Sequence, residues 1–489
     1  MRASPLIMRG VSAGITVVLL SQTAPVTAFD VSSLRAALET ASLRSPAQPA
    51  GMSVFVADLA TGDPLLARNA DSPQTLASVT KLISSAAVLH YLGPQYKYRT
   101  TFWRQGEPQN GKLAGSLLVL GSGDPNISGR FYDDDYNAVF DAWVDGLRRA
   151  GVSRVSGDLI LNASVFDSVG RHPDWPAGQE ARWYQAPISA LSYNDNVVLV
   201  SIAPGRRLGG PVAISIDPPT GLLRAVSSAR TVGRRARVRL AVSRAAGSNA
   251  VSVSGTVPLR GAWWSTPIAI DDPPRFFGAA LRNRMKNGGI QLDGRMVESS
   301  TRPDASWKLV ATTESELLAS LSVVNKRSQG FYAEQVFKTL SAERAGRGSW
   351  TESVNLAKQF LGTLGLDPGA YEIRDGSGLS PRNRASAREI VRFLHAMERH
   401  PYGSLWRSTL AFSGDSEGTL RHRFREPQLA GKVAAKTGSI KAVSTLAGYV
   451  TANSGRNYVF AILLNGRGVW DASGHAYQDR LIRTLILNG

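Results

Sequence analysis

The sequence contains no cysteine in its 489 residues. This absence excludes disulfide bonds, thiolate nucleophiles and cysteine-based metal sites, so the fold must be stabilised by packing. Histidine is also scarce, and the six histidines show no spacing that is typical of metal ligands. We therefore predict neither a metal site nor a cofactor.

Long hydrophobic runs are missing from most of the chain. No segment after residue 28 reaches the roughly 20 apolar residues that a membrane-spanning helix needs. Residues 1–28 combine two early arginines, a short apolar run and the small residues Val26-Thr27-Ala28, a pattern that is typical of a cleaved export signal. We therefore expect a periplasmic protein without a transmembrane anchor.

Acidic side chains are too few to balance the basic ones. The 56 lysines and arginines exceed the 38 acidic residues, which gives a formal net charge of +18. This charge favours anionic partners such as cell-wall polymers or lipid head groups, whereas export argues against nucleic acid. Peripheral contact with anionic surfaces is therefore compatible with the sequence.

The densest basic segment covers residues 230–244. Within it, the alternation at residues 235–240 predicts a strand with arginines on one face and Val238 and Leu240 on the other. We interpret this segment as the solvated face of an antiparallel strand, in preference to a dedicated polyanion site.

The length of the chain exceeds what one hydrophobic core usually supports, so more than one domain is expected. From about residue 98 to residue 301, short strand-like runs are separated by Gly, Pro, Asn and Asp, and helical patterns are few. Clear helical patterns return after residue 314. We therefore predict a β-rich insertion at residues 97–301, while residues 29–96 and 302–489 form one discontinuous domain.

Apolar periodicity places several helices and strands around this insertion. Strands are predicted at residues 52–60, 65–68, 434–437, 444–451 and 457–464. A helix at residues 77–92 ends at Gly93-Pro94 and carries apolar residues on more than one face, which predicts that it is buried. Further helices are predicted at residues 136–150, 274–288, 314–325, 331–344, 352–364, 386–399 and 476–487.

A serine and a lysine stand three residues apart at the start of this buried helix, in Ser78-Val79-Thr80-Lys81. The spacing places the hydroxyl and the ammonium on one helix face within reach of each other. A neutral lysine can take the seryl proton, and burial together with a second cation would lower the lysine pKa. The structural alternative is a serine that begins the helix and a lysine that snorkels to solvent.

A second segment, Lys436-Thr437-Gly438-Ser439, ends a predicted strand in the second half of the chain. On an edge strand its ammonium and hydroxyl groups can hold a substrate carboxylate, while Gly438 lets the substrate backbone approach closely. Lys436 is also a candidate for the second cation that lowers the pKa of Lys81.

With these and other motifs the chain resembles the D-Ala-D-Ala carboxypeptidases of the penicillin-binding protein 4 type, the S13 serine peptidases. The matching stretches follow the order of that family and extend over nearly the whole chain after residue 28. They are Thr75-Leu76-Ala77-Ser78-Val79-Thr80-Lys81, Gly121-Ser122-Gly123-Asp124-Pro125, Ala186-Pro187-Ile188-Ser189-Ala190-Leu191, Asn325-Lys326-Arg327-Ser328 with Tyr332-Ala333-Glu334, Asp375-Gly376-Ser377-Gly378-Leu379-Ser380, and Lys436-Thr437-Gly438-Ser439.

The resemblance implies an α+β fold with a penicillin-binding or serine β-lactamase-like transpeptidase core. In such a core, helices flank an antiparallel sheet, and here a large, mostly β insertion follows the nucleophile helix. The resemblance also implies that Ser78 is the acylated nucleophile, Lys81 its base, and Ser328 a proton relay to the departing D-alanine.

The same resemblance assigns the substrate-binding residues. Lys436, Thr437, Gly438 and Ser439 would bind the substrate, with the three polar side chains on its terminal carboxylate. Backbone N–H groups of Ser78 and Ser439 would form the oxyanion hole.

One position departs from the pattern of the family, whose middle motif is Ser-x-Asn. Residues 333–334 fix the register so that Gly330 stands where the asparagine is expected. The missing amide would hydrogen-bond the lysine base and the acyl side of the substrate, so its loss is expected to cost about 10²-fold in rate. Gln329 or a water molecule could take its place. A Ser-x-Asn copy at residues 192–194 lies in the insertion, and we interpret it as non-catalytic.

We therefore predict a penicillin-sensitive, serine-type D-Ala-D-Ala carboxypeptidase or endopeptidase. It would act on peptidoglycan peptide stems through an acyl-enzyme, and β-lactam antibiotics would acylate the same serine. The alternative, motivated by Gly330, is a catalytically impaired protein that binds peptidoglycan without cleaving it. A β-lactamase or esterase on the same core is disfavoured because those enzymes lack the large insertion.

Overall fold

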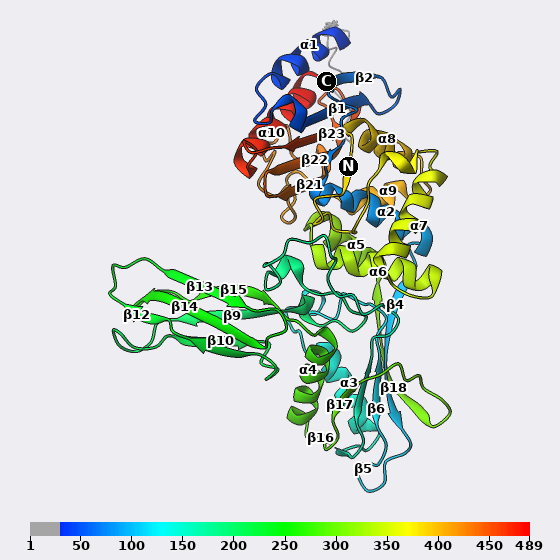
Figure 1. The fold of residues 1–489 in the computed structure, drawn as a ribbon. Helices are drawn as coiled ribbons and strands as arrows, with labels where there is room; N and C mark the ends of the chain where they lie inside the picture. Colours follow the sequence, from blue (N-terminus) through cyan, green and yellow to red (C-terminus); the bar gives the residue numbers. More distant parts are fainter. Residues whose placement is uncertain (1–29) are drawn as a thin grey trace, which may run out of the picture.

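The computed structural model describes residues 30–489, and the predicted export signal at residues 1–28 lies outside the described residues. Helices and sheets are mixed in an α+β fold, as predicted (Figure 1). A six-stranded antiparallel sheet has the order β2-β1-β23-β22-β21-β20, so the first and last parts of the chain meet in one sheet. Its strands are β1 (Met52–Asp58), β2 (Pro64–Arg68), β20 (Ala411–Phe412), β21 (Val433–Ile440), β22 (Val443–Thr451) and β23 (Asn457–Asn465).

Helices cover both faces of this sheet (Figure 1). One face is covered by α1 (Val31–Ser42) and α10 (Asp471–Asn488), which pack against each other. The remaining helices of this part of the molecule belong to a core on the opposite face. They are α2 (Thr80–Leu92), α5 (Leu317–Lys326), α6 (Gly330–Ala345), α7 (Trp350–Thr363), α8 (Ala387–Glu398) and α9 (Gly403–Ser408).

Alternating side chains of β1 divide between these two cores. Val54 and Val56 lie in the core beside α1 and α10, whereas Phe55 and Ala57 lie in the core that contains α2. A strand that is buried on both faces is mostly apolar, because successive side chains point to opposite faces. Strand β23 is apolar from Tyr458 to Leu464, whereas β22 also buries Ser444 and Thr445. Both strands were predicted to within one residue at each end.

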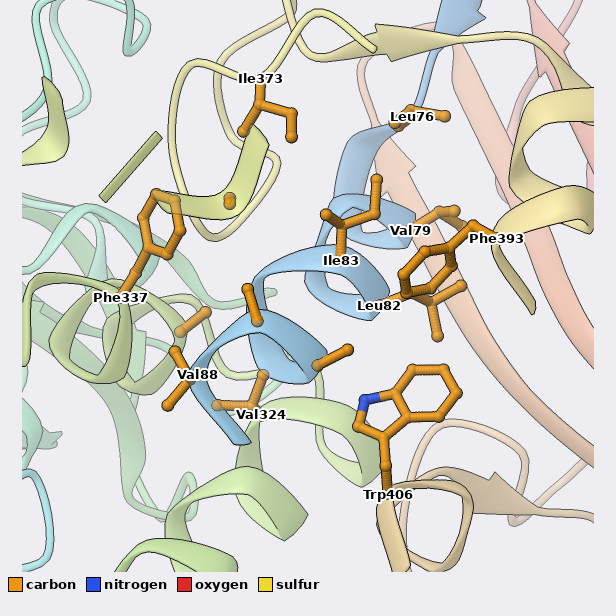
Figure 2. Close-up of a cluster of buried hydrophobic side chains, with 14 of the residues drawn as sticks. Leu76, Val79, Leu82, Ile83, Val88, Val324, Phe337, Ile373, Phe393 and Trp406 are labelled. Atoms are coloured by element: carbon orange, nitrogen blue, oxygen red, sulfur yellow. The ribbon is translucent and has the colours of Figure 1, made fainter. Parts of the chain in front are cut away.

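Helix α2 is buried on every side. Residues 80–89 are all buried, and the helix packs against α5, α6 and α7. Figure 2 shows Leu82 and Val88 of this helix in one cluster with Val324 and Phe337. Full burial of such a side chain contributes about 1.5–3 kcal/mol, so the packing of α2 fixes the position of the residues at its N-terminal end.

A second sheet, of five strands, lies in the middle of the chain in the order β17-β8-β6-β4-β18. Its strands are β4 (Lys97–Gln105), β6 (Leu117–Leu120), β8 (Leu159–Asn162), β17 (Met296–Glu298) and β18 (Trp307–Glu316), and α3 (Ala138–Arg149) and α4 (Pro273–Asn287) share its core. Strand β18 pairs antiparallel with β4 through Glu316. The helix predicted at residues 314–325 was therefore wrong at its start, because the pairing with β4 keeps the chain extended until α5 begins at Leu317.

Two small sheets complete the connections around these layers. Strands β5 (Lys112–Leu113), β7 (Arg154–Val155) and β16 (Gln291–Leu292) form a short parallel sheet, and β3 (Gln74–Thr75) pairs with β19 (Arg384–Ala385). The second pairing ties the segment that precedes α2 to the segment that precedes α8.

A β-sandwich projects from the rest of the molecule, on the left of Figure 1. One sheet contains β9 (Val197–Ala203), β10 (Ala213–Asp217) and β15 (Trp264–Ala269); the other contains β11 (Arg224–Ser227), β12 (Arg230–Val232), β13 (Arg239–Arg244) and β14 (Ala250–Pro258). The two sheets share a core of alternating aliphatic side chains, which are Val198, Val200, Ile202, Val251, Val253 and Val257.

The strand predicted at residues 235–240 was wrong over most of its length. Strand β13 begins only at Arg239, and residues 233–238 form an exposed turn after β12. A hydrogen bond from the Ala236 N–H to the Gly233 carbonyl (3.0 Å) is part of this turn. Val238 therefore has no buried face to occupy, and it is 44% exposed.

Candidate active site

A cavity of about 660 Å³ brings together segments that are distant in the sequence. Its walls come from the start of α2, the loop between α5 and α6, the loop before β19, the end of β21 and a loop of the middle region. Five of the seven predicted site residues line this cavity, namely Ser78, Lys81, Ser328, Thr437 and Ser439. The other two, Lys436 and Gly438, contact these residues from behind.

Ser78 lies in a short 3-10 turn, Ala77–Val79, that leads directly into α2. Glycines from two distant segments pack against the backbone at this point. A Cβ atom on Gly378 would lie 1.8 Å from the Ala77 carbonyl oxygen, and one on Gly438 would lie 2.9 Å from the Ser78 nitrogen. The absence of side chains at these two glycines therefore allows β21 and the loop before β19 to approach the serine.

We expect the substitution Gly438→Ala to disturb this contact strongly. The new Cβ would also lie 2.3 Å from Thr445 Oγ1, so β21 or the Ser78 segment must move, at a cost of about 1–3 kcal/mol in folding free energy. D-alanine release should fall at least about tenfold, because a shift of 1 Å at a reacting group has effects of this size or larger. Gly233→Ala is the matched control, since its Cβ would meet nothing within 4 Å; equal activity of the two variants would contradict the expectation.

The side chain of Lys81 reaches back to the serine, as the three-residue spacing predicted. Its Nζ donates to Ser78 Oγ at 2.9 Å and to the Ser377 carbonyl at 2.5 Å. The lysine is 2% exposed, so it does not snorkel to solvent. Burial lowers the pKa of Lys81 to about 8, against the opposing influence of Glu334 and Asp375.

Lys436 lies on β21 and is fully buried. Its Nζ donates to Ser328 Oγ at 2.7 Å and to the Thr437 carbonyl at 2.7 Å. Burial lowers the pKa of Lys436 well below its usual value, and the positive charge of Lys81 lowers it further. Lys436 was a candidate for the second cation that lowers the pKa of Lys81. Instead, the charge of Lys81 lowers the pKa of Lys436, whereas the pKa of Lys81 is lowered by burial.

Ser328 occupies a tight turn between α5 and α6, with a positive φ of 59°. Gly330 begins α6 and lines the cavity. The side chain of Gln329, which was considered as a replacement for the missing asparagine, donates to Asp195 Oδ2 at 3.3 Å and does not line the cavity. The second Ser-x-Asn copy also lies elsewhere, because Ser192 is buried and donates to the Ser189 carbonyl.

The loop that contains Gly376 and Ser377, between α7 and β19, completes the surroundings of Lys81. Glu334 on α6 accepts backbone N–H groups of Gly376 and Ser377 at 2.9 and 2.8 Å. Burial and the neighbouring Asp375 raise the pKa of Glu334 to about 7. Because this loop presents the Ser377 carbonyl to Lys81, Glu334 helps to position Lys81 through the loop.

The contribution of Ser377 was missed at the sequence level because a backbone carbonyl leaves no trace in residue type. The motif Asp375-Gly376-Ser377-Gly378 could be recognised in the sequence, but its contact with Lys81 could not. A wall of the cavity formed by Gln179, Trp183 and Tyr184 of the middle region was also missed.

Ser439 has a partner that the sequence did not indicate. Its hydroxyl donates to Asp471 Oδ1 at 2.5 Å, at the first residue of α10. The hydroxyl must therefore rotate away from this carboxylate before it can donate to a ligand in the cavity.

The fold and the cavity together define a serine hydrolase of the penicillin-binding type. A serine and a buried lysine at the start of one helix face a lysine on the adjoining strand, with an antiparallel sheet flanked by helices behind them. The chain belongs to the D-Ala-D-Ala carboxypeptidase 3 (S13) family, whose model matches residues 34–485.

Individual relatives agree with this membership. The chain is 29% identical to a D-alanyl-D-alanine carboxypeptidase of Actinomadura sp. (strain R39) over 87% of this chain and 79% of the relative. It is 24% identical to the D-alanyl-D-alanine carboxypeptidase DacB of Haemophilus influenzae over 83% of this chain and 84% of that relative.

The fold is also similar to a crystal structure of penicillin binding protein 4 from Haemophilus influenzae. The match has a TM-score of 0.79 at 22% identity, and covers 94% of this chain and 99% of that chain. A crystal structure of the same protein in complex with a β-lactam matches with a TM-score of 0.76 at 21% identity. The chain therefore has the penicillin-binding fold over nearly its whole length.

Within residues 30–489, no helix is both long and apolar enough to cross a bilayer. The same residues contain no group of three or more histidine and acidic side chains arranged to hold a metal ion.

Proposed function

We propose that this protein is a periplasmic D-Ala-D-Ala peptidase that cleaves peptidoglycan stem peptides through an acyl-enzyme on Ser78. One observation carries the assignment of the serine: the Lys81 Nζ lies 2.9 Å from Ser78 Oγ inside a single cavity that Ser328 and the end of β21 also line. Membership in a family of serine peptidases supports catalysis over the alternative of a protein that only binds peptidoglycan.

The acylation step begins with the transfer of the Ser78 hydroxyl proton. Neutral Lys81 takes the proton of Ser78 while Oγ attacks the carbonyl carbon of the penultimate D-alanine. Backbone N–H groups of Ser78 and Ser439 receive the negative charge that develops on the carbonyl oxygen. The C–N bond then breaks, and the terminal D-alanine leaves as an amine.

The departing amine needs a proton, and a second pair of residues can deliver it. Ser328 Oγ accepts a hydrogen bond from Lys436 Nζ at 2.7 Å, so a proton that the hydroxyl gives to the amine can be replaced from the lysine. Water then hydrolyses the ester: its oxygen bonds to the acyl carbon, one of its protons returns to Ser78 Oγ, and the shortened stem leaves. Proton exchange with solvent restores neutral Lys81 and protonated Lys436. A β-lactam amide would follow the same first step, with the ring nitrogen as the leaving group that stays attached.

The terminal carboxylate of the substrate would lie at the end of β21. Thr437 and Ser439 supply hydroxyl donors from the cavity wall, and Lys436 behind them would carry a positive charge once the carboxylate is bound, because a neighbouring anion raises the pKa of a lysine. In a cross-linked stem the amide bond to be cleaved also begins at a D-alanine carbonyl carbon. The carboxypeptidase and endopeptidase reactions would therefore use the same residues. Assays with a pentapeptide and with a cross-linked dimer would measure the ratio of the two activities.

Acylation by penicillin should depend on pH through Lys81. With a pKa of about 8, only about a tenth of the lysine is neutral at pH 7. The second-order acylation rate constant is therefore expected to rise nearly tenfold per pH unit below pH 7 and to level off above pH 8. Stopped-flow measurements with a fluorescent penicillin would test this; a flat profile between pH 6 and pH 9 would exclude Lys81 as the base.

Restoring the family's amide at position 330 should raise activity. A Cβ at Gly330 would meet only the Tyr184 carbonyl oxygen at 3.6 Å and Ser377 Cβ at 3.8 Å, which are ordinary contacts. The asparagine amide could then donate to the acyl side of the substrate, so Gly330→Asn should increase D-alanine release by about 10- to 10²-fold. Gly330→Ala is the control, since it adds the same Cβ without an amide. Equal rates of the two variants would show that the amide is not what the natural enzyme lacks.

The binding-only alternative has its own test. The protein would be sedimented with purified cell wall while D-alanine release from the wall is measured. Release at a rate above that of Ser78→Ala supports the peptidase; sedimentation with no release would favour the binding protein.

A further inference from the structure

Three loops lie together at one end of the projecting β-sandwich. The strand pairs place them there: β9 meets β15 at Ile202 and Trp264, and β12 and β13 meet β14 near Thr256. The connecting loops after β9, before β13 and before β15 therefore leave the sandwich at the same end. Gly209 and Gly210 also exchange backbone hydrogen bonds of 2.9 Å with Thr231 on β12, which joins the first loop to the second sheet. We call residues 204–210, 233–238 and 259–263 the basic tip.

The basic tip is the end of the sandwich that faces away from the rest of the molecule. At the opposite end, Arg244 donates to the Ala269 carbonyl at 2.9 Å, and Asp217 accepts from Tyr136 of the middle region. The nine residues of β14 separate these two ends by about 30 Å. Figure 1 shows the sandwich extending sideways, so the basic tip is free to touch an extended surface.

The charge of the basic tip has one sign. Its three loops contain six exposed arginines and no acidic residue; the arginines are Arg206, Arg207, Arg234, Arg235, Arg237 and Arg260. Among the residues that the structure describes, none of these six forms a salt bridge, whereas Arg154 and Arg388 elsewhere on the surface pair with Asp293 and Asp71. Self-repulsion of six unpaired guanidinium groups is unfavourable unless an anionic partner relieves it.

Each loop of the basic tip also exposes one apolar side chain. Leu208 is 60% exposed, Val238 is 44% exposed and Trp263 is 59% exposed. Their exposure is not explained by the lack of a hydrophobic core, because Val253 and Val257 beneath the tip are buried in one. Arginines mixed with tryptophan and aliphatic side chains are the composition of proteins that rest on anionic lipid surfaces.

We propose that the basic tip binds the surface of a bilayer that contains anionic phospholipid. The guanidinium groups would meet the lipid phosphates, while Leu208, Val238 and Trp263 would enter the head-group region. A soluble anionic polymer would satisfy the arginines but would leave the three apolar side chains exposed, which is why a bilayer is the better match. None of the tip residues lines the active-site cavity, so the attached enzyme keeps its cavity open to substrate.

The test measures co-sedimentation of the chain from residue 29 onward with vesicles of phosphatidylcholine alone or with one-third phosphatidylglycerol. A tip variant and a control variant each replace three exposed, unpaired arginines by glutamine. The tip variant carries Arg234→Gln, Arg235→Gln and Arg237→Gln; the control variant carries Arg44→Gln, Arg302→Gln and Arg399→Gln. D-alanine release from a soluble peptide should be unchanged in both variants, which shows that they are folded.

The native chain should bind the anionic vesicles and not the neutral ones. The tip variant should bind them at least about tenfold more weakly, since each arginine near an anionic surface adds to the affinity, while the control variant should lie within about twofold of the native chain. Equal loss in both variants, or no vesicle binding by the native chain, would overturn the proposal.

Trp263→Ser separates a bilayer from an anionic polymer. This variant should weaken vesicle binding at least about threefold, because an interfacial aromatic anchor is lost, and should leave binding to soluble polyphosphate unchanged. Unchanged vesicle binding by Trp263→Ser, or polyphosphate binding without vesicle binding by the native chain, would contradict a lipid surface and favour a polymer.

Discussion

Replacing Ser78 with alanine is expected to abolish covalent labelling by penicillin and to lower D-alanine release at least about 10⁴-fold. The expected loss is large because nucleophile and base act as one unit, so removal of the nucleophile eliminates the covalent route entirely. Within residues 30–489 the serine hydroxyl has a 2.9 Å hydrogen bond with Lys81, and Ser78 belongs to none of the hydrophobic cores, so the protein should remain folded. Fluorescent penicillin labelling and a coupled D-alanine assay measure both effects.

The matched control is Ser84→Ala on the same helix. Ser84 is buried, donates to the Gly376 carbonyl at 2.7 Å and does not line the cavity. This variant should lose stability but keep its penicillin label. Retention of the label in Ser78→Ala, or its loss in a folded Ser84→Ala, would contradict the assignment of the nucleophile.

Replacing Lys81 with methionine should have the second largest effect. The chain length and apolar packing are kept, but no group remains within hydrogen-bond distance to take the seryl proton, so acylation should slow by about 10³-fold or more. Substrate affinity should change little, since the terminal carboxylate is assigned to Lys436 and the hydroxyls of β21. The acylation rate constant and the dissociation constant of the unreacted complex would be measured separately by stopped flow.

Lys338→Met provides the control for this loss. Lys338 is another fully buried lysine, but it donates to Asp167 and to the Val169 carbonyl and does not line the cavity. Its replacement should lower stability, because Asp167 loses its partner, and should leave acylation within a few-fold of the native rate. Equal slowing by both substitutions would mean that the effect of Lys81→Met is structural.

The central strands and the buried helix α2 could be predicted from the sequence because their physical signals are local. β23 is apolar on both faces, and α2 ends just before Gly93, whose backbone N–H donates to the Leu89 carbonyl. Helix α1 was missed, since Leu34 and Leu38 are the only large apolar side chains among its four buried residues and make a narrow stripe. The turn at residues 233–238 was missed because an alternating pattern does not reveal whether a partner strand is present.

The candidate site could be predicted where it consists of side chains. It was missed where a backbone group contributes. Ser78, Lys81 and Lys436 were found through spacing and resemblance, and the structure brings them to one cavity or directly behind it. The Ser377 carbonyl that accepts from Lys81 depends on long-range packing of Glu334 against a loop more than forty residues later. No residue pattern near Lys81 could reveal that contact.

Gly330 gives the cavity a feature of its own. The position is open enough to accept a side chain, while Gln329 beside it is held by Asp195. A water molecule is therefore the remaining candidate for the role of the missing amide. The natural enzyme would then be slower than one with asparagine at this position, and it would still use the serine and both lysines.

The most direct measurement is peptide mass spectrometry of the protein after brief treatment with penicillin. If the hydroxyl at the start of α2 is the nucleophile, the intact antibiotic mass should be found on the proteolytic peptide that contains Ser78 and on no other. An adduct on a different serine, such as Ser192 or Ser328, or no adduct on a folded and stable protein, would contradict the account.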